Sequence, residues 1–215
     1  MNSFFCSWSG GKDSCFALYY AINNGLEPGK LLTMMTDDKI SRSHGLTIEV
    51  LKSQAASLNI PLITCPTTWD NYEENFIYML KHIKKEGIHN GVFGDIDIQE
   101  HREWVTGVCS KVNMKAFLPL WNRSRKELVE DFINKGFKAI IVAINEKVMG
   151  REYLGKVLSE KSVNKFVEIG IDPSGENGEY HTVVIDGPIF TFPLNIEMGN
   201  IVSHNGYCFQ KASIT

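Results

Sequence analysis

Six consecutive residues near the N-terminus combine the groups that bind phosphate, namely Ser9-Gly10-Gly11-Lys12-Asp13-Ser14. Two glycines let the backbone turn tightly and bring its N–H groups close to an anion. A helix directly after them would add its positive dipole end. Lys12 supplies a cation, Ser9 and Ser14 supply hydroxyls, and Asp13 could hold a magnesium ion shared with phosphate oxygens. A tight turn with a helix cap uses the same residue types, so composition alone leaves both interpretations open.

The order of these residues is more specific than their types. The loop is not a Walker A motif, because the G-x-x-x-x-G-K-[ST] spacing is absent, and it is not a dinucleotide fingerprint. The S-G-G-K-D-S string after an N-terminal strand resembles the PP-loop of the ATP pyrophosphatases, also called the adenine nucleotide alpha-hydrolase-like family. This resemblance implies ATP binding at Ser9–Ser14 and cleavage between the alpha and beta phosphates, with Mg²⁺ carried in by ATP.

Polar residues also follow two further strands that the sequence predicts. Ligands bind at the carboxyl ends of the strands in an open parallel sheet. The residues after the strand at 31–36 are Asp37, Asp38, Ser41, Arg42, Ser43 and His44, and those at the end of the strand at 89–94 are Gly94, Asp95, Asp97, Glu100, His101, Arg102 and Trp104. We expect Arg42 and His44 to neutralise phosphate or a substrate carboxylate. We expect Gly94 and Asp95 to line the nucleotide, and His101 and Arg102 to face the same crevice.

A metal centre and cysteine chemistry find little support in the sequence. His44, His101 and His181 match no zinc-binding spacing such as H-E-x-x-H. The five cysteines are scattered without a C-x-x-C pair, which is typical of reduced thiols in a cytosolic protein. Cys15 and Cys109 fall within predicted helices, where a buried structural thiol is the usual role.

A second motif lies near the C-terminus, in Glu176-Asn177-Gly178-Glu179-Tyr180-His181-Thr182. Alone it could be an exposed Asn-Gly turn. Beside the loop it resembles the E-G-G-E-[FY]-x-T motif of the diphthine–ammonia ligases, a group within the PP-loop family. Residues 92–96, 101–104 and 186–188 also look like that group, so the resemblance covers nearly the whole chain. Asn177 stands where the family usually has glycine, and the short chain looks like the compact prokaryotic type.

The resemblance implies an ATP-dependent amidation of diphthine, a modified histidine on translation elongation factor 2. The substrate carboxylate would be adenylated with release of pyrophosphate, and ammonia from free ammonium would then displace AMP. Catalytic roles are implied for Lys12, Asp13, Glu176, Glu179 and His181, with Asp13 as the metal ligand. Lys12, Arg42 and Arg102 would offset phosphate charge. Two alternatives stay open: adenylation of a different small-molecule or RNA acceptor, and a non-catalytic ATP or AMP sensor.

The elements that position these residues alternate along the chain. Apolar runs predict strands at 3–8, 31–36, 61–65, 89–94 and 138–144, separated by helices at 13–24, 47–59, 70–86, 97–112 and 124–135. Three helix starts match a capping box: Asp70 with Glu73, Asp97 with Glu100 and Ser124 with Glu127. Strand runs at 182–185, 189–192 and 207–210 follow. The pattern predicts an α/β fold, a Rossmann-like parallel sheet with helices on both faces plus a small C-terminal subdomain with β hairpins.

Length and composition set the remaining limits. The chain of 215 residues predicts an ATP-binding core at 1–120 and a substrate-binding subdomain at 121–215. A net charge of -3 argues against a nucleic-acid partner. No apolar run approaches the length of a membrane helix and no signal peptide is recognisable, so we expect a cytoplasmic protein without a membrane partner. The oligomeric state is not fixed by the sequence, and a homodimer is one option.

Overall fold

The computed structural model describes residues 2–36, 39–42 and 44–215. The chain forms two compact units. Unit 1 contains Met1–Ser9, Asp13–Arg42 and Asn59–Asn122, and unit 2 contains Gly10–Lys12, Ser43–Leu58 and Arg123–Thr215. Two short segments from the N-terminal half therefore belong to unit 2. The predicted functional division at residue 120 remains a prediction.

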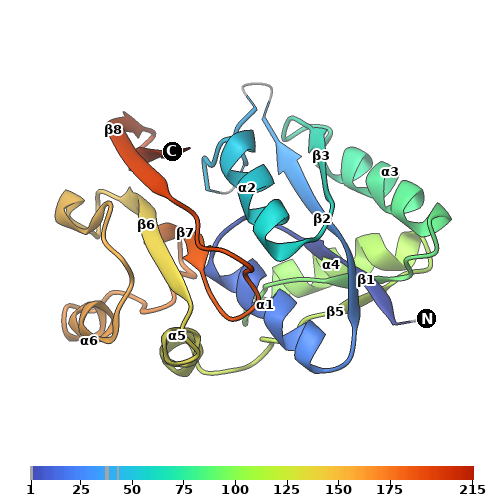
Figure 1. The fold of residues 1–215 in the computed structure, drawn as a ribbon, viewed down its shortest axis with the longest axis horizontal. Coiled ribbons are helices and arrows are strands. Elements are labelled where there is room, and N and C mark those ends of the chain that lie inside the picture. Colours follow the sequence, from blue (N-terminus) through green and yellow to red (C-terminus); the bar gives the residue numbers. More distant parts are fainter. Residues whose placement is uncertain (1, 37–38, 43) are drawn as a thin grey trace. The chain divides into compact units, whose positions relative to one another are not determined.

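Unit 1 is built on a five-stranded sheet with the order β3-β2-β1-β4-β5, in which all neighbouring strands are parallel (Figure 1). Its strands are β1 (Ser3–Ser7), β2 (Glu27–Met35), β3 (Leu62–Pro66), β4 (Asn90–Val92) and β5 (Lys115–Phe117). The parallel α/β fold is confirmed, although the three-residue β5 was not predicted. The chain reverses its direction of winding between β1 and β4, so the loops after these two strands meet at the switch point where such sheets bind ligands.

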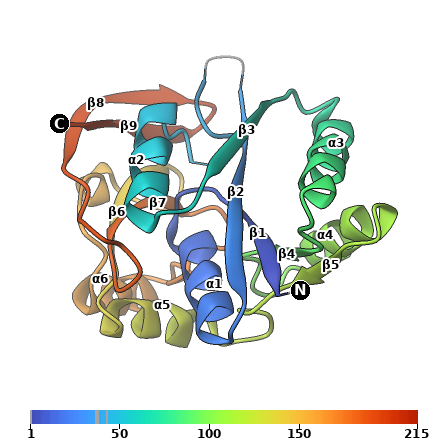
Figure 2. The same ribbon diagram turned by 45° about the vertical axis from the view of Figure 1, so that its right-hand side comes forward.

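Helices cover both faces of this sheet. They are α1 (Lys12–Asn23), which unit 1 holds from Asp13 on, α3 (Tyr72–Lys85) and α4 (Gln99–Lys111). Figure 2 shows α1 on one side of β1 and β2, and α3 and α4 on the other. Phe76 of α3 and Val108 of α4 pack with Phe5 and Phe93 in one buried cluster. The helices predicted at 70–86 and 97–112 are therefore confirmed as α3 and α4.

Two of the three predicted capping boxes are wrong. The N-cap of α3 is Asn71 rather than Asp70, and the N-cap of α4 is Ile98 rather than Asp97; neither side chain caps its helix. The Asn71 side chain instead accepts a hydrogen bond from the backbone N–H of Thr68 at 2.8 Å. At α5 (Arg125–Asn134) the predicted N-cap is confirmed, because the Ser124 hydroxyl accepts a hydrogen bond from the Glu127 N–H.

Unit 2 contains an antiparallel sheet with the order β7-β6-β9-β8. Its strands are β6 (Lys138–Asn145), β7 (Tyr180–Asp186), β8 (Ile196–His204) and β9 (Tyr207–Ile214). The strand predicted at 138–144 is therefore present, but it pairs antiparallel and does not extend the parallel sheet. The strand predicted at 189–192 is wrong. Those residues form a turn whose Thr191 N–H donates to the Ser57 carbonyl at 2.9 Å.

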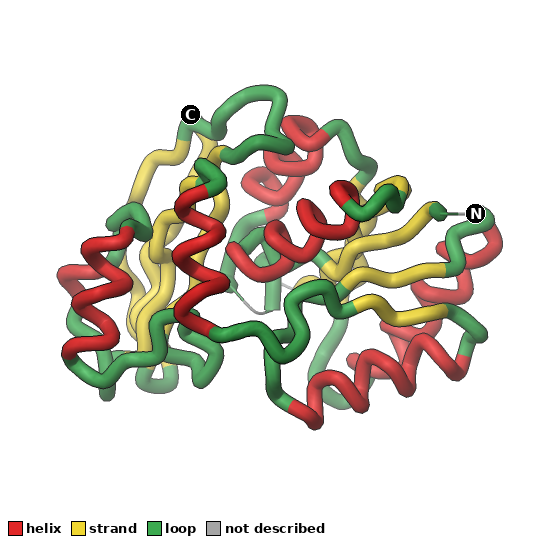
Figure 3. The backbone as a smooth tube through the Cα atoms, turned by 90° about the horizontal axis from the view of Figure 1, so that it is seen from below, coloured by secondary structure: helices red, strands yellow, loops and turns green. Residues whose placement is uncertain are grey.

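The helices of unit 2 are α2 (Ile48–Leu58), α5 (Arg125–Asn134) and α6 (Glu160–Glu168), with a short 3-10 turn η1 at Arg151–Tyr153. Val129 of α5 and Phe166 of α6 share a buried cluster with Ile141 of β6 and Cys208 of β9. Figure 3 shows these strands in yellow with the helices in red beside them. Within residues 2–36, 39–42 and 44–215, no helix is long and apolar enough to cross a membrane.

Candidate nucleotide-binding site

The phosphate loop follows β1, as expected, and its two ends in unit 1 are tied together. The hydroxyls of Ser9 and Ser14 lie 3.0 Å apart, and the Ser9 N–H donates to the Ser14 hydroxyl at 3.4 Å. The Ser14 side chain is buried at the first turn of α1. These contacts bend the chain between β1 and α1, which places the positive dipole end of a helix at the end of a central strand.

Gly94 at the end of β4 lies against the same helix start. A Cβ at this position would lie 2.8 Å from the carbonyl carbon of Asp13 and 2.8 Å from the nitrogen of Ser14. Both atoms belong to the backbone and cannot move aside, so only glycine permits this approach. The structure thus brings together two segments of the predicted site, the loop after β1 and the loop after β4.

In unit 2, the middle of the phosphate loop is held by β7. The carbonyl of Gly10 accepts hydrogen bonds from the Val184 N–H and from the side-chain amide of Gln54, both at 2.9 Å. The Gln54 amide also donates to the Val184 carbonyl at 2.7 Å. Gln54 is completely buried, so water could not replace its amide as the hydrogen-bond partner of the Gly10 and Val184 carbonyls. The loop is therefore a fixed feature of this unit.

Lys12 is held at both its backbone and its side chain. Its N–H donates to the hydroxyl of Thr182 at 3.1 Å, and its Nζ lies 5.4 Å from the centre of the Tyr180 ring. Only 5% of Lys12 is exposed. A buried ammonium requires compensating negative charge or electron-rich groups. The position suits a cation that meets phosphate oxygens.

His44 packs directly on the loop but does not carry the charge that we expected. Its Nδ1–H donates to the carbonyl of Thr182 at 2.7 Å, and a Cβ on Gly11 would overlap its ring. Burial lowers the pKa of His44 to about 4, and the nearby Lys12 cation lowers it further, against the raising effect of the Thr182 carbonyl. The imidazole is therefore neutral at physiological pH, so it cannot neutralise phosphate.

The remaining predicted residues of unit 1 lie at the same carboxyl edge. Arg42 donates from Nε to the Thr67 carbonyl at 3.0 Å, also contacts that carbonyl through Nη2, and stacks over the Trp69 ring at 4.8 Å. His101 Nδ1 lies 3.4 Å from the Asp95 carboxylate. Arg102 lies over the Trp121 ring at 5.0 Å. Asp37, Asp38 and Ser43 lie outside the described residues.

The C-terminal motif forms a turn organised by two carboxylates. Asp172 pairs with Arg125 at 2.6 Å and accepts from the Ser174 N–H at 2.9 Å and from the Glu176 N–H at 3.0 Å. Its side chain is only 6% exposed, so these contacts compensate a charge that has lost most of its water. This ion pair fixes the position of the predicted residue Glu176.

Glu179 is the second carboxylate, and its contacts lie within the motif. Its two oxygens accept from the backbone N–H of Asn177 at 3.1 Å and from the Asn177 side-chain amide at 3.2 Å. The Asn177 side-chain oxygen in turn accepts from Arg125 at 3.0 Å. Asn177 is absent from the residues with positive φ, whereas Gly178 has φ +82°. Asn177, which replaces the family glycine, therefore does not adopt the left-handed conformation. Its side chain instead connects Arg125 to Glu179.

No three His, Cys, Asp or Glu side chains among the described residues are arranged to hold a metal ion. Mg²⁺ bound with ATP needs only one or two carboxylates besides the phosphates. Asp13, half-buried at the first turn of α1, is of the right chemical type for this role. Burial raises the pKa of the Cys15 and Cys6 thiols, so both stay protonated and are poor nucleophiles.

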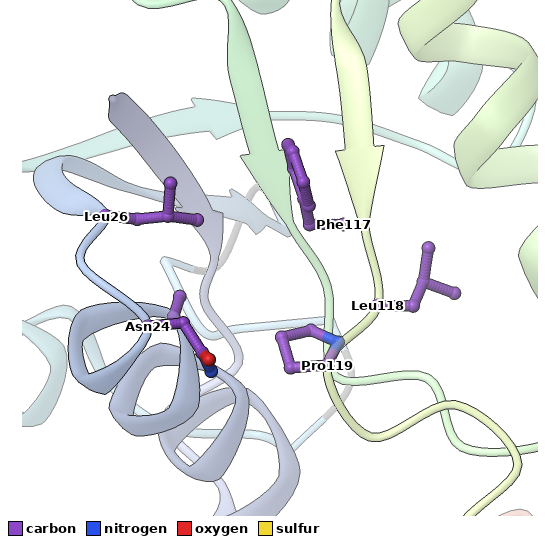
Figure 4. Close-up of a pocket in the computed structure, with 6 residues that line it drawn as sticks. Asn24, Leu26, Phe117, Leu118 and Pro119 are labelled. Carbon is purple, nitrogen blue, oxygen red and sulfur yellow. The ribbon is translucent and has the colours of Figure 1, made fainter. Parts of the chain in front are cut away.

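A cavity of about 280 Å³ lies elsewhere in unit 1. Its lining comes from α1 and the turn before β2 (Ala21, Asn24 and Leu26) and from the end of β5 and the segment after it (Phe117, Leu118 and Pro119). Figure 4 shows five of these side chains with labels, Asn24, Leu26, Phe117, Leu118 and Pro119. None of these side chains is ionisable, and none was predicted as a site residue. The cavity therefore offers packing surface but no catalytic groups.

Several residues that contact the loop or the motif were not predicted as site residues. Thr182 and Gln54 bind the loop, and the hydroxyl of Tyr207 donates to the Gly178 carbonyl at 3.0 Å. Gln54 could have been recognised because it is a polar residue among the apolar positions of α2. Tyr207 gave no such signal, since its partner lies far away in sequence.

Two family models match the chain. The model described as the diphthamide synthase N-terminal domain matches residues 3–116, and the diphthamide synthase C-terminal domain matches residues 124–214. The first match includes the phosphate loop and Gly94, and the second includes the C-terminal motif. Together they cover most of the chain.

Curated proteins with similar sequences are named diphthine–ammonia ligase. The protein from Danio rerio is 27% identical over 227 residues, which cover 94% of this chain and 89% of the relative. The one from Rattus norvegicus is 26% identical, over 94% of this chain and 85% of the relative. The one from Schizosaccharomyces pombe is 25% identical over 233 residues, 94% of this chain but 38% of the relative. Short length therefore does not mark a prokaryotic type, because the vertebrate relatives are nearly as compact.

Proposed function

The chain belongs to the diphthamide synthase family, and we propose that it is an ATP-dependent ligase that converts diphthine to diphthamide on translation elongation factor 2. The curated relatives that cover most of this chain carry the name of that activity. Diphthine is a histidine side chain extended by a group that carries a carboxylate beside a quaternary ammonium. The carboxylate is the group to be amidated.

The reaction has two steps. In the first, a carboxylate oxygen attacks the alpha phosphorus of ATP, the bond to the bridging oxygen breaks, and pyrophosphate leaves. In the second, ammonia attacks the acyl carbon, the bond to the AMP oxygen breaks, and AMP leaves with the electron pair. Adenylation is needed because a bare carboxylate is a poor acylating agent, whereas AMP is a good leaving group. The ammonia comes from ammonium that has lost a proton.

The observation that carries the proposal is the hydrogen bond between Lys12 and Thr182. Lys12 belongs to the phosphate loop, and Thr182 is the threonine of the C-terminal motif. The two sequence signatures of the family therefore meet within unit 2. The Thr182 hydroxyl fixes the backbone of Lys12 at the start of α1, where the positive end of the helix dipole lies. This contact supports a role of the motif in nucleotide chemistry.

We assign the residues of Ser9–Ser14, with Gly94 and Asp95, to ATP binding. Lys12 would offset the charge on the leaving pyrophosphate, and Arg42 and Arg102 supply further cations at the carboxyl edge of unit 1. Asp13 would hold Mg²⁺, which supplies Lewis acidity to the phosphates when it is bound. The close approach of the Gly94 backbone to Asp13 and Ser14 supports this assignment, because Gly94 has no side chain that could cover the start of α1.

On the acceptor side, Glu176 and His181 remain our candidates for substrate binding or for deprotonating ammonium. Glu179 receives a different role, because both of its oxygens already accept hydrogen bonds from Asn177. We assign it to shaping the turn. We further propose ammonium as nitrogen source and a cytoplasmic location, where elongation factor 2 acts; the choice between monomer and homodimer stays a prediction.

Pyrophosphate release tests the proposed function. The wild-type protein is incubated with ATP, Mg²⁺ and ammonium, with and without diphthine-bearing elongation factor 2. Release that requires the modified factor, together with a mass change that matches the amide, supports the ligase. Release that requires a different carboxylate or an RNA indicates another acceptor. Tight ATP binding without release under any of these conditions indicates a sensor.

A further inference from the structure

Four aromatic rings form a continuous row in unit 2, which we call the aromatic platform: His44, His181, Tyr207 and Phe209. The ring centres of His44 and His181 are 4.8 Å apart, those of His181 and Tyr207 are 6.3 Å apart, and those of Tyr207 and Phe209 are 6.1 Å apart. All four residues keep some exposed surface, although protein atoms surround the His44 ring closely enough to lower its pKa. Rings that only fill a core are normally buried, so this row requires another explanation.

The sheet register explains why three of the rings share a face. His181 of β7 and Phe209 of β9 both pair with Ala143 on the strand between them. Residues directly opposite one another in antiparallel strands lie on the same face, and Tyr207 shares that face because it is two positions from Phe209.

The platform begins at the phosphate loop. The His44 ring lies where a Cβ of Gly11 would be, and its Nδ1–H donates to the Thr182 carbonyl. The Thr182 hydroxyl accepts from the Lys12 N–H. A group bound on these rings is therefore next to the segment that we assign to the ATP phosphates.

The rings suit a cation better than an anion. A ring face carries partial negative charge, and a cation interacts favourably within about 6 Å of a ring centre. Because neighbouring rings are 4.8 to 6.3 Å apart, one compact cation can contact two of them at once. The His44 imidazole is neutral, because burial lowers its pKa, so it does not repel such a group.

We propose that the aromatic platform binds the quaternary ammonium group of the acceptor side chain and thereby presents the adjoining carboxylate to ATP. This inference rests on the proposed function and adds the recognition site for its substrate. A quaternary ammonium has no N–H to donate, so stacked ring faces are the protein surface that recognises it most directly.

The test compares two substitutions that both remove the Tyr207 hydroxyl. Tyr207→Phe keeps the ring face, whereas Tyr207→Leu removes it. We expect Tyr207→Leu and Phe209→Leu each to raise the KM for diphthine-bearing elongation factor 2 about tenfold, with the KM for ATP unchanged. Tyr207→Phe should raise this KM much less than Tyr207→Leu, because it keeps the ring face and loses only the hydrogen bond to the Gly178 carbonyl. Phe192→Leu is the control, because Phe192 is an exposed aromatic of the same unit outside the platform.

Small probes test the charge requirement. Glycine betaine, which carries a quaternary ammonium beside a carboxylate, should inhibit competitively with the protein acceptor. Its isostere tert-butylacetate keeps the carboxylate but has carbon in place of the ammonium nitrogen, so it lacks the cation and should inhibit much less. Equal inhibition by both probes would overturn the proposal. So would equal effects of Tyr207→Leu and Tyr207→Phe, or a rise in the KM for ATP, which would indicate that the rings hold the adenine base. Absence of turnover in the wild-type protein would instead overturn the proposed function.

Discussion

The backbone N–H of Lys12 donates a hydrogen bond to the side-chain hydroxyl of Thr182, with N and Oγ1 3.1 Å apart. The two residues are 170 positions apart in the chain, and Thr182 is only 1% exposed. A buried N–H without a partner costs about 1–3 kcal/mol. The conformation of the phosphate loop therefore depends on a residue of the C-terminal motif.

Thr182→Val removes this acceptor while keeping the shape of the side chain. We expect a fall in kcat for pyrophosphate release of about tenfold to a hundredfold, because the loop loses its fixed conformation. Thr182→Ser retains the hydroxyl and should recover most of the activity. Steady-state kinetics measure both effects. Equal activity of the valine and serine variants would show that this hydrogen bond has no part in positioning the loop.

Lys12→Ala should abolish pyrophosphate release and leave the fold intact. The ammonium is the loop's own cation, and removal of such a group from a phosphoryl-transfer site costs several kcal/mol of transition-state stabilisation. Lys12→Met is the matched variant, because it keeps the apolar stem that packs near Tyr180 but lacks the charge. Circular dichroism checks the fold. Normal turnover by either variant would exclude the loop as the phosphate site.

The sequence predicted the central features of unit 1 because each of them is local. Short apolar runs gave β1 and β4, and helical spacing gave α3. The order of residues in the phosphate loop also identified its chemistry without any knowledge of the sheet. Where the signal was weak, the prediction failed: β8 was missed because most of its residues are exposed and its alternation extends over only the first few positions.

Contacts between distant segments were not predictable. The turn at 189–192 resembles a strand in composition, but Ser57 supplies its hydrogen bonds from α2. The contacts of the Arg42 guanidinium with the Thr67 carbonyl and the Trp69 ring could not be predicted either, since both partners are remote in sequence. The charge of His44 was predicted wrongly for the same reason, since its burial arises from chain segments that are remote in sequence.

Gly94→Ala should disturb the contact between the loop after β4 and the start of α1. The added Cβ would lie 2.8 Å from two backbone atoms, so the loop must shift. We expect a loss of about 1–3 kcal/mol in the free energy of unfolding and weaker ATP binding. Gly107→Ala is the control, because a Cβ there meets nothing within 4 Å and alanine favours the helix. Denaturant titration measures the free energy of unfolding of both variants, and calorimetry measures their ATP affinity. Equal effects of Gly94→Ala and Gly107→Ala would disprove the close approach at Gly94.

The pH dependence of stability should report on His44. Its pKa in the folded protein is about 4, below its ordinary value of 6.5, so the folded state favours the neutral ring. Above about pH 6.5 both folded and unfolded chains hold it neutral, and its contribution is fully present. As the pH falls from 6.5 towards 4, the unfolded chain binds a proton that the folded chain does not, so stability is lost, by about 1–3 kcal/mol in total.

His44→Asn tests this, because the asparagine amide can still donate to the Thr182 carbonyl but does not titrate in this range. Denaturant titrations at about pH 7 and about pH 5 give the free energy of unfolding of both proteins. Wild type should lose more stability than His44→Asn over this interval. Lys12 and His181 also face the His44 ring, and His181→Gln, measured in parallel, identifies any contribution of the second histidine. Identical losses in wild type and His44→Asn would mean that His44 is not held neutral by the fold.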